Sequence, residues 1–154
     1  MTFFQDLISN ELFMSAASSW LVAQVLKTII HTFITKDFSL ERMYGSGGMP
    51  SSHSATVTAL ATASALVHGA GSSEFAISAI LAIIVMYDAR GVRRETGIQA
   101  QVLNHLIELL TDIHNEIMPI DAKLKEFVGH TPLQVLVGSL LGFVIACLVH
   151  MVFV

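Results

Sequence analysis

Two histidines, His53 and His130, each lie where an apolar helix is expected to begin, and both could take part in phosphoryl transfer. A helix N-terminus presents unpaired backbone N–H groups and the positive end of the helix dipole, so it attracts phosphate oxygens. At such a place one imidazole can attack phosphorus while another protonates the leaving oxygen. Ser51 and Ser52, directly before His53, add two hydroxyls. The alternative for residues 47–55 is a serine-capped helix after a Gly/Pro turn.

The residues after His130 are those of a helix start. Thr131 suits the N-cap, Pro132 suits the first helical position, and Gln134 suits the third, which together make a capping box. This pattern explains the whole stretch except His130, which stands just outside the expected helix.

Candidate phosphate ligands are cations close to these helix starts. Lys27 lies inside an apolar segment, and a charge at the bilayer centre costs at least about 2.5 kcal/mol. Lys27 is therefore a functional candidate. The alternative is that its side chain snorkels to the membrane interface. Arg42 lies in the following loop, and Arg93 and Arg94 follow another apolar segment. Guanidinium groups suit bidentate phosphate recognition. Asp88 could orient a histidine or an arginine, although the run from 87 to 94 would also serve as a membrane-surface anchor.

The composition indicates a membrane protein. Of the 154 residues 53% are hydrophobic and 13% are charged, about half the roughly 25% charge of a soluble domain. Eight Lys and Arg residues and a formal charge of −4 exclude a nucleic-acid-binding surface. The single cysteine, Cys147, excludes an internal disulfide or a cysteine zinc site.

We expect an all-α integral membrane helical bundle, in one domain over residues 1–154, with about four transmembrane or re-entrant helices. The expected segments are residues 12–34, 54–68, 75–87 and 132–154, of which the middle two are shorter than the about 20 residues of a full span. Apolar residues at helical spacing between 98 and 117 predict an amphipathic interfacial helix on the membrane surface or capping the bundle. Gly138 and Gly142 permit close helix contact, and assembly into a homo-oligomer is left open.

The loop cations fall on one face of a four-span bundle, which the positive-inside rule would make cytoplasmic. The same cations are candidate phosphate ligands, so their position leaves the orientation open. The expected location is the bacterial cytoplasmic membrane.

Together these residues resemble the divergent branch of the type 2 phosphatidic acid phosphatase and vanadium haloperoxidase superfamily. The resemblance rests on Gly-Gly-Met-Pro-Ser-Ser-His-Ser-Ala at 47–55, Asp-Ala-x-Gly-Val-Arg-Arg at 88–94 and Gly-His-Thr-Pro at 129–132. The superfamily signatures are K-x6-R-P, P-S-G-H and S-R-x5-H-x3-D. The resemblance implies that His130 is the nucleophile, that His53 is the general acid and that Lys27 is the lysine of the first signature.

The chain departs from these signatures at several positions. Arg42 follows Lys27 after fourteen residues rather than six. Neither residue of the Ser-Arg pair is present before His130, so Arg93 or Arg94 would have to supply the guanidinium. Gln134 stands where an aspartate should orient the nucleophile, and it cannot stabilise an imidazolium as a carboxylate does. Asp88 or Glu126 are candidate replacements for that acid.

The resulting hypothesis is a membrane-embedded phosphatase that hydrolyses a lipid-linked phosphate monoester or diphosphate through a phosphohistidine. The phosphate would be held by Lys27, Arg42, Arg93 or Arg94 and the Ser51-Ser52 backbone, with no metal or cofactor. The partner is then a membrane lipid that bears a phosphate or diphosphate, and no nucleic acid. The alternative, which Gln134 favours, is a non-catalytic membrane protein that uses the anion pocket to bind phospholipid headgroups or a partner.

Overall fold

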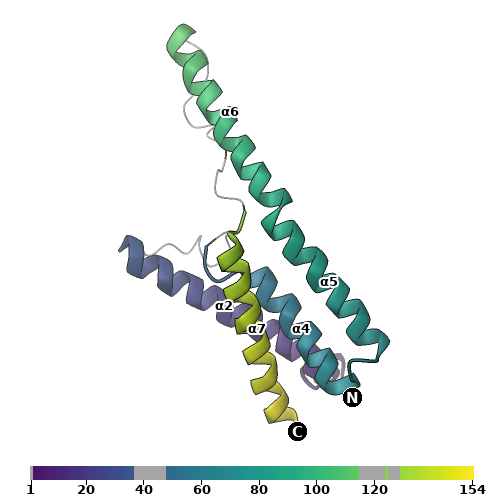
Figure 1. The fold of residues 1–154 in the computed structure, drawn as a ribbon. Coiled ribbons are helices and arrows are strands. Elements are labelled where there is room, and N and C mark those ends of the chain that lie inside the picture. Colours follow the sequence, from purple (N-terminus) through teal and green to yellow (C-terminus); the bar gives the residue numbers. More distant parts are fainter. Residues whose placement is uncertain (1, 37–47, 115–123, 125–128) are drawn as a thin grey trace.

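The computed structural model describes residues 2–36, 48–114, 124 and 129–154, and all regular structure in this part of the chain is helical. The prediction of an all-α fold is therefore confirmed. The helices, labelled where space allows in Figure 1, are α1 (Phe3–Ile8), α2 (Glu11–Thr35), α4 (Ser52–His68), α5 (Ser73–Arg90), α6 (Val92–His114) and α7 (Pro132–Phe153).

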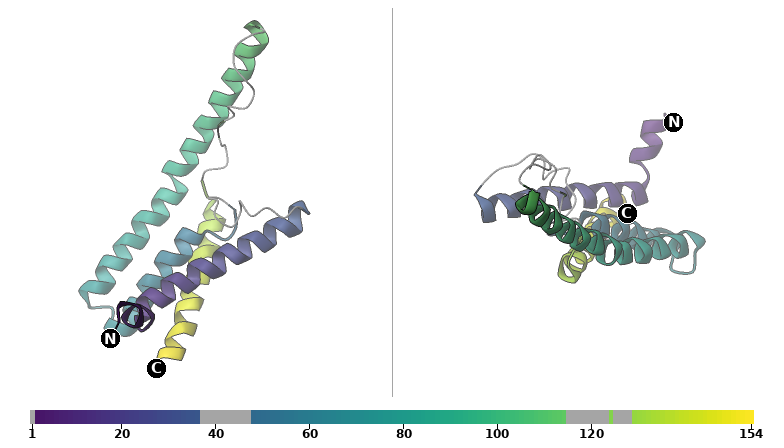
Figure 2. Two further views of the ribbon diagram at one scale, coloured as in Figure 1. Left: turned by 180° about the vertical axis from the view of Figure 1, so that it is seen from behind. Right: turned by 90° about the horizontal axis from the view of Figure 1, so that it is seen from above.

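Helix α4 is the centre of the bundle, because it packs against α2, α5 and α7 (Figures 1 and 2). Helices α4 and α7 run in the same direction, since Gly138 lies against Ser51 and Gly142 lies against Ala55. Helix α2 runs the opposite way. Leu12, at its start, packs on the far half of α4, whereas Lys27, near its end, lies beside Gly48 before α4 begins.

The core consists of small side chains. Apart from Val57, every buried hydrophobic residue in the described part is an alanine, including Ala59, Ala63 and Ala146, which form one cluster. Large apolar side chains of α2, α5 and α7 are instead exposed. Small residues allow helix backbones to approach closely, and lipid can cover the larger side chains outside. This distribution is that of a membrane bundle.

Three helical stretches in the described residues are long and apolar enough to cross a membrane, namely Glu11–Thr35, Ser73–Leu109 and Pro132–Phe153. Helix α4 has 17 residues, which at about 1.5 Å per residue is about 26 Å long. All four expected segments are therefore helices, and the short second one is the buried centre rather than an outer span.

Helix α6 continues the line of α5 instead of capping the bundle (Figures 1 and 2). Gly91 is the one residue between the two helices. Its backbone N–H donates to the Tyr87 carbonyl at 2.8 Å and its carbonyl accepts from the Glu95 N–H at 3.1 Å, so the helical hydrogen-bond ladder runs through the junction. Among the described elements, α6 packs only on α5.

Candidate functional site

The first turns of α4 and α7 lie side by side at one end of the bundle. The Ser51 backbone N–H donates to the Gln134 carbonyl at 3.1 Å. A Cβ atom added at Gly138 would overlap the Ser51 carbonyl oxygen, so only a glycine permits this approach. Because the two helices are parallel, the positive ends of both dipoles point to the same region. His53 is the second residue of α4 and His130 precedes the N-cap of α7, so both histidines belong to this end.

The His130 side chain is held by Gln134. Residue 130 is 3% exposed, and its backbone N–H donates to the Ala89 carbonyl at 3.1 Å. Its ring Nδ1 lies 3.2 Å from Gln134 Oε1, and that same Oε1 accepts from the Thr131 backbone N–H at 3.0 Å. A backbone N–H can only donate, so the shared atom is the amide oxygen and Nδ1 must carry a proton. In the neutral ring, Nε2 is then the nitrogen with the lone pair.

The capping box predicted at this helix start is confirmed. Thr131 is the N-cap, its hydroxyl accepts from the Gln134 N–H at 3.3 Å, and Pro132 is the first helical residue. Gln134 therefore caps α7 and positions His130 with one amide oxygen.

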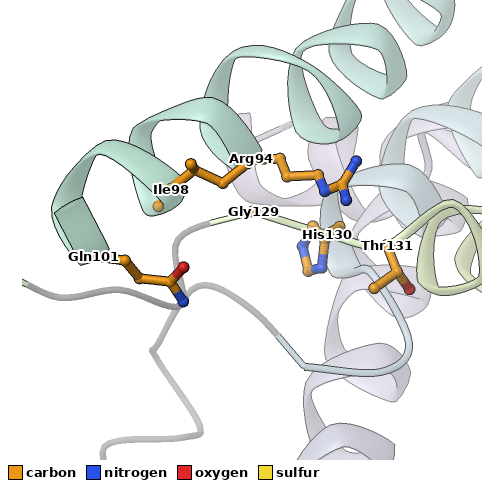
Figure 3. A pocket seen from close by; sticks show the side chains of 7 residues that line it. Arg94, Ile98, Gln101, Gly129, His130 and Thr131 are labelled. Carbon is orange, nitrogen blue, oxygen red and sulfur yellow. The ribbon is translucent and has the colours of Figure 1, made fainter.

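A cavity of about 180 Å³ lies between the start of α6 and the segment that carries His130. Arg94 extends from α6 toward His130 in Figure 3. The other residues that line this cavity are Gly97, Ile98, Gln101, Gly129 and Thr131. Arg94 is exposed, so its guanidinium can reach an anion in this cavity.

A second cavity of about 220 Å³ is lined by both Lys27 and Gln134. Lys27 is 3% exposed and does not extend to the surface. Its side chain packs against Gly48, where an added Cβ would lie 3.2 Å from Lys27 Cγ and where φ is +85°. A side chain at Gly48 would therefore be strained and would crowd the lysine. The other lining residues are Ile30, His31, Ile34 and Met49.

The serines before His53 are part of the helix cap. Ser51 is the N-cap of α4, and its hydroxyl accepts from Ser54 Oγ at 2.9 Å and from the Ser54 N–H at 3.4 Å. Ser52 is buried in the first turn. His53 is exposed and lines neither of the two cavities.

Lys27 and Arg94 line different cavities among the described residues. Arg94 lines the cavity that His130 also lines, and Lys27 lines the cavity that Gln134 also lines. Asp88 is half-buried, next to the residue whose carbonyl binds the His130 backbone. Arg42 and Glu126 lie outside the described residues, as does the side chain of Arg93.

Arg94 was a candidate from the sequence, but the other α6 residues that line its cavity were not predicted. Arg94, Ile98 and Gln101 are spaced by four and three residues, so a helical period starting from Arg94 would have placed them on one face. Nothing in the sequence indicated that the Ala89 carbonyl would bind the His130 backbone N–H, because a backbone contact between distant segments depends on packing. Within the described residues, no group of three His, Cys, Asp or Glu side chains could hold a metal ion.

Comparison with known proteins finds a matching family and a similar membrane protein. The family described as "Divergent PAP2 family" matches residues 8–145. An uncharacterized membrane protein of Bacillus subtilis (strain 168), YuiD, is 41% identical over 148 residues, which cover 91% of this chain and 94% of the relative. No solved structure matches the chain.

Proposed function

The chain belongs to the divergent PAP2 family, and from this premise we propose that it is a phosphatase of the bacterial cytoplasmic membrane acting on a lipid-linked phosphate monoester or diphosphate. The observation that carries the proposal is the convergence of two helix N-termini beside a buried histidine whose Nδ1–H is held by Gln134. Such a place attracts an anion and presents a nucleophilic nitrogen.

The charges and sizes of the two cavities suit a phosphate headgroup. Arg94 supplies a cation to the cavity that His130 lines, and Lys27 supplies one to the cavity that Gln134 lines. Cavities of about 180 and 220 Å³ are smaller than the roughly 300–1,000 Å³ of sites for drug-sized ligands, so neither holds a whole lipid. Ile30 and Ile34 line the Lys27 cavity and are also exposed on the outside of α2, which offers the lipid tail an apolar path.

The proposed reaction has two steps. Nε2 of His130 attacks phosphorus, the bond from phosphorus to the leaving oxygen breaks, and His53 donates a proton to that oxygen. Water then attacks phosphorus of the phosphohistidine and gives a proton to His53. The bond from phosphorus to Nε2 breaks, so phosphate leaves and Nε2 regains its lone pair. Nδ1 keeps its proton on Gln134 throughout. His53 must turn toward the substrate for this role, since its side chain is exposed.

A second candidate function is favoured by Gln134 itself. An amide oxygen accepts a hydrogen bond but carries no net charge, so it stabilises a cationic imidazole less than a carboxylate does. A protein that binds phospholipid headgroups without cleaving them needs the cations and helix N-termini but no strong nucleophile.

The test is phosphate release by the purified protein in lipid nanodiscs that contain phosphatidate, a prenyl phosphate or a prenyl diphosphate. We expect His130→Ala to lower the rate by about 10³-fold or more, as for loss of a covalent nucleophile. His68→Ala is the matched control, because His68 is an exposed histidine at the opposite end of α4. Its rate should equal that of the wild type.

Binding of the same lipids separates the two candidates. Hydrolysis that His130→Ala leaves unchanged would exclude His130 as the nucleophile. Wild-type protein that binds phosphate lipids through Lys27, loses that binding in Lys27→Met and releases no phosphate would instead establish the non-catalytic function.

A further inference from the structure

One buried stripe of α2 carries polar side chains at intervals of four residues. The buried residues Ser15, Ser19 and Lys27 follow this spacing, Ala23 occupies the position between Ser19 and Lys27, and the partly buried Glu11 lies four residues before Ser15. Both serines are 0% exposed and Lys27 is 3% exposed. In the described part of the chain, α2 packs only on the short helix α1 before it and on α4 and α7. The stripe therefore lies in the interface of α2 with α4 and α7, at the centre of a membrane bundle.

Three buried polar atoms of α2, two on this stripe and one on the adjacent Gln24, lack a protein partner among the described residues. Within the described residues, no hydrogen bond reaches Ser15 Oγ, Ser19 Oγ or Gln24 Oε1, although all three are buried. Two threonine hydroxyls on the same helix bond to backbone carbonyls one turn earlier. Thr28 donates to the Gln24 carbonyl at 3.0 Å, and Thr32 donates to the Thr28 carbonyl at 2.9 Å. The two serine hydroxyls are buried but make no such bond. A buried polar atom without a partner is costly, and bound water is the usual solution.

We propose that the interface of α2 with α4 and α7 binds a row of water molecules through Ser15, Ser19 and Gln24. Ser15 and Ser19 are four residues apart, a spacing that puts Cβ atoms on one helix about 5–6 Å from each other. Neither hydroxyl has a hydrogen-bond partner among the described residues, so the two are not bonded directly, and one water between them bonds to both. Ala23 and the buried alanines of α4 and α7 carry no polar side-chain atom that could take the place of water as a hydrogen-bond partner.

The row of water lies between the cavity that Lys27 lines and a contact between Glu11 and His150 near the other end of α2. At one end lie Gln24 and Lys27, and Lys27 shares a cavity with Gln134. At the other end Glu11 Oε1 lies 2.7 Å from His150 Nδ1, which joins α2 to α7. From Glu11 to Lys27 there are sixteen residue steps, or about 24 Å, most of the roughly 30 Å hydrocarbon core. Phosphate hydrolysis does not need this row, so the proposal is independent of the proposed reaction.

Exchange of a buried thiol proton measures the proposed water directly. Ser19→Cys is made in a Cys147→Ala background, so that it carries the single thiol, and the S–H stretch is followed by infrared spectroscopy in nanodiscs after transfer to D₂O. We expect conversion to S–D within minutes. The matched control is Ser78→Cys on α5, because Ser78 is 5% exposed and its hydroxyl donates to the Phe75 carbonyl at 3.0 Å. That thiol should keep its proton for hours.

A Ser19→Cys thiol that stays protonated for hours would overturn the proposal, and so would equal exchange of both thiols. Ser15→Cys provides the same measurement if the first variant does not fold. The midpoint of thermal unfolding tests the proposal independently. Ser19→Ala removes a water-binding hydroxyl and should lower the midpoint. A higher midpoint would show that the hydroxyl is an unsatisfied group in a dry interface, which contradicts the proposal.

Discussion

Replacing Gly138 with alanine tests the contact that brings the two helix N-termini together. A Cβ at this position would overlap the Ser51 carbonyl oxygen and would lie 3.2 Å from both the carbonyl carbon and Cβ of Ser51. These are mainly backbone atoms, and the Ser51 N–H is itself bonded to the Gln134 carbonyl at 3.1 Å. No flexible side chain can move aside, so α4 and α7 must separate.

The expected cost follows from two opposing effects. Overpacking costs about 1–3 kcal/mol, and a clash with backbone belongs at the upper end of that range. Alanine is about 1 kcal/mol better than glycine inside a helix, which offsets part of this cost. The net loss is then about 2 kcal/mol. For a chain of this size that corresponds to a fall of about 4–8 °C in the unfolding midpoint.

Thermal unfolding of the purified protein in nanodiscs measures this effect. Gly71→Ala is the matched control, because a Cβ there meets nothing within 4 Å, and its midpoint should equal that of the wild type. Separation of Ser51 from Gln134 should also lower phosphate release at temperatures where Gly138→Ala is still folded. A Gly138→Ala midpoint at or above the wild-type value would refute the close approach of α4 and α7.

Two further substitutions test side-chain hydrogen bonds made by Asn104 of α6 and Gln134 of α7. Asn104→Ala removes two hydrogen bonds of 2.9 Å, one from Asn104 Nδ2 to the Leu124 carbonyl and one from the Leu124 N–H to Asn104 Oδ1. Each such bond contributes about 0.5–1.5 kcal/mol, so their loss should lower the unfolding midpoint by several degrees. Gln134→Glu keeps both acceptor contacts, to Thr131 and His130, and adds a negative charge beside the ring. It should raise the phosphate-release rate about tenfold or more, and an unchanged rate would mean that Gln134 does not limit the nucleophile.

Local features of this protein were predictable because they depend on neighbouring residues. The four apolar segments are all helices, and the Thr131, Pro132 and Gln134 capping box has the predicted form, since both follow from short-range periodicity and hydrogen bonding. The spacing of Gly138 and Gly142 predicted close helix contact. Only the fold showed that the partner is α4 of the same chain.

The sequence determined by itself that the chain is a helical membrane protein, because composition and the length of apolar runs control insertion into lipid. It also named His53, His130, Lys27 and Gln134 as candidates. Tertiary packing alone decided that Gln134 lies between the Lys27 cavity and His130, that Arg94 occupies a different cavity, and that His53 is exposed. These relations join segments far apart in the chain, and they depend on how small residues allow α2, α4 and α7 to approach one another, which no local pattern encodes.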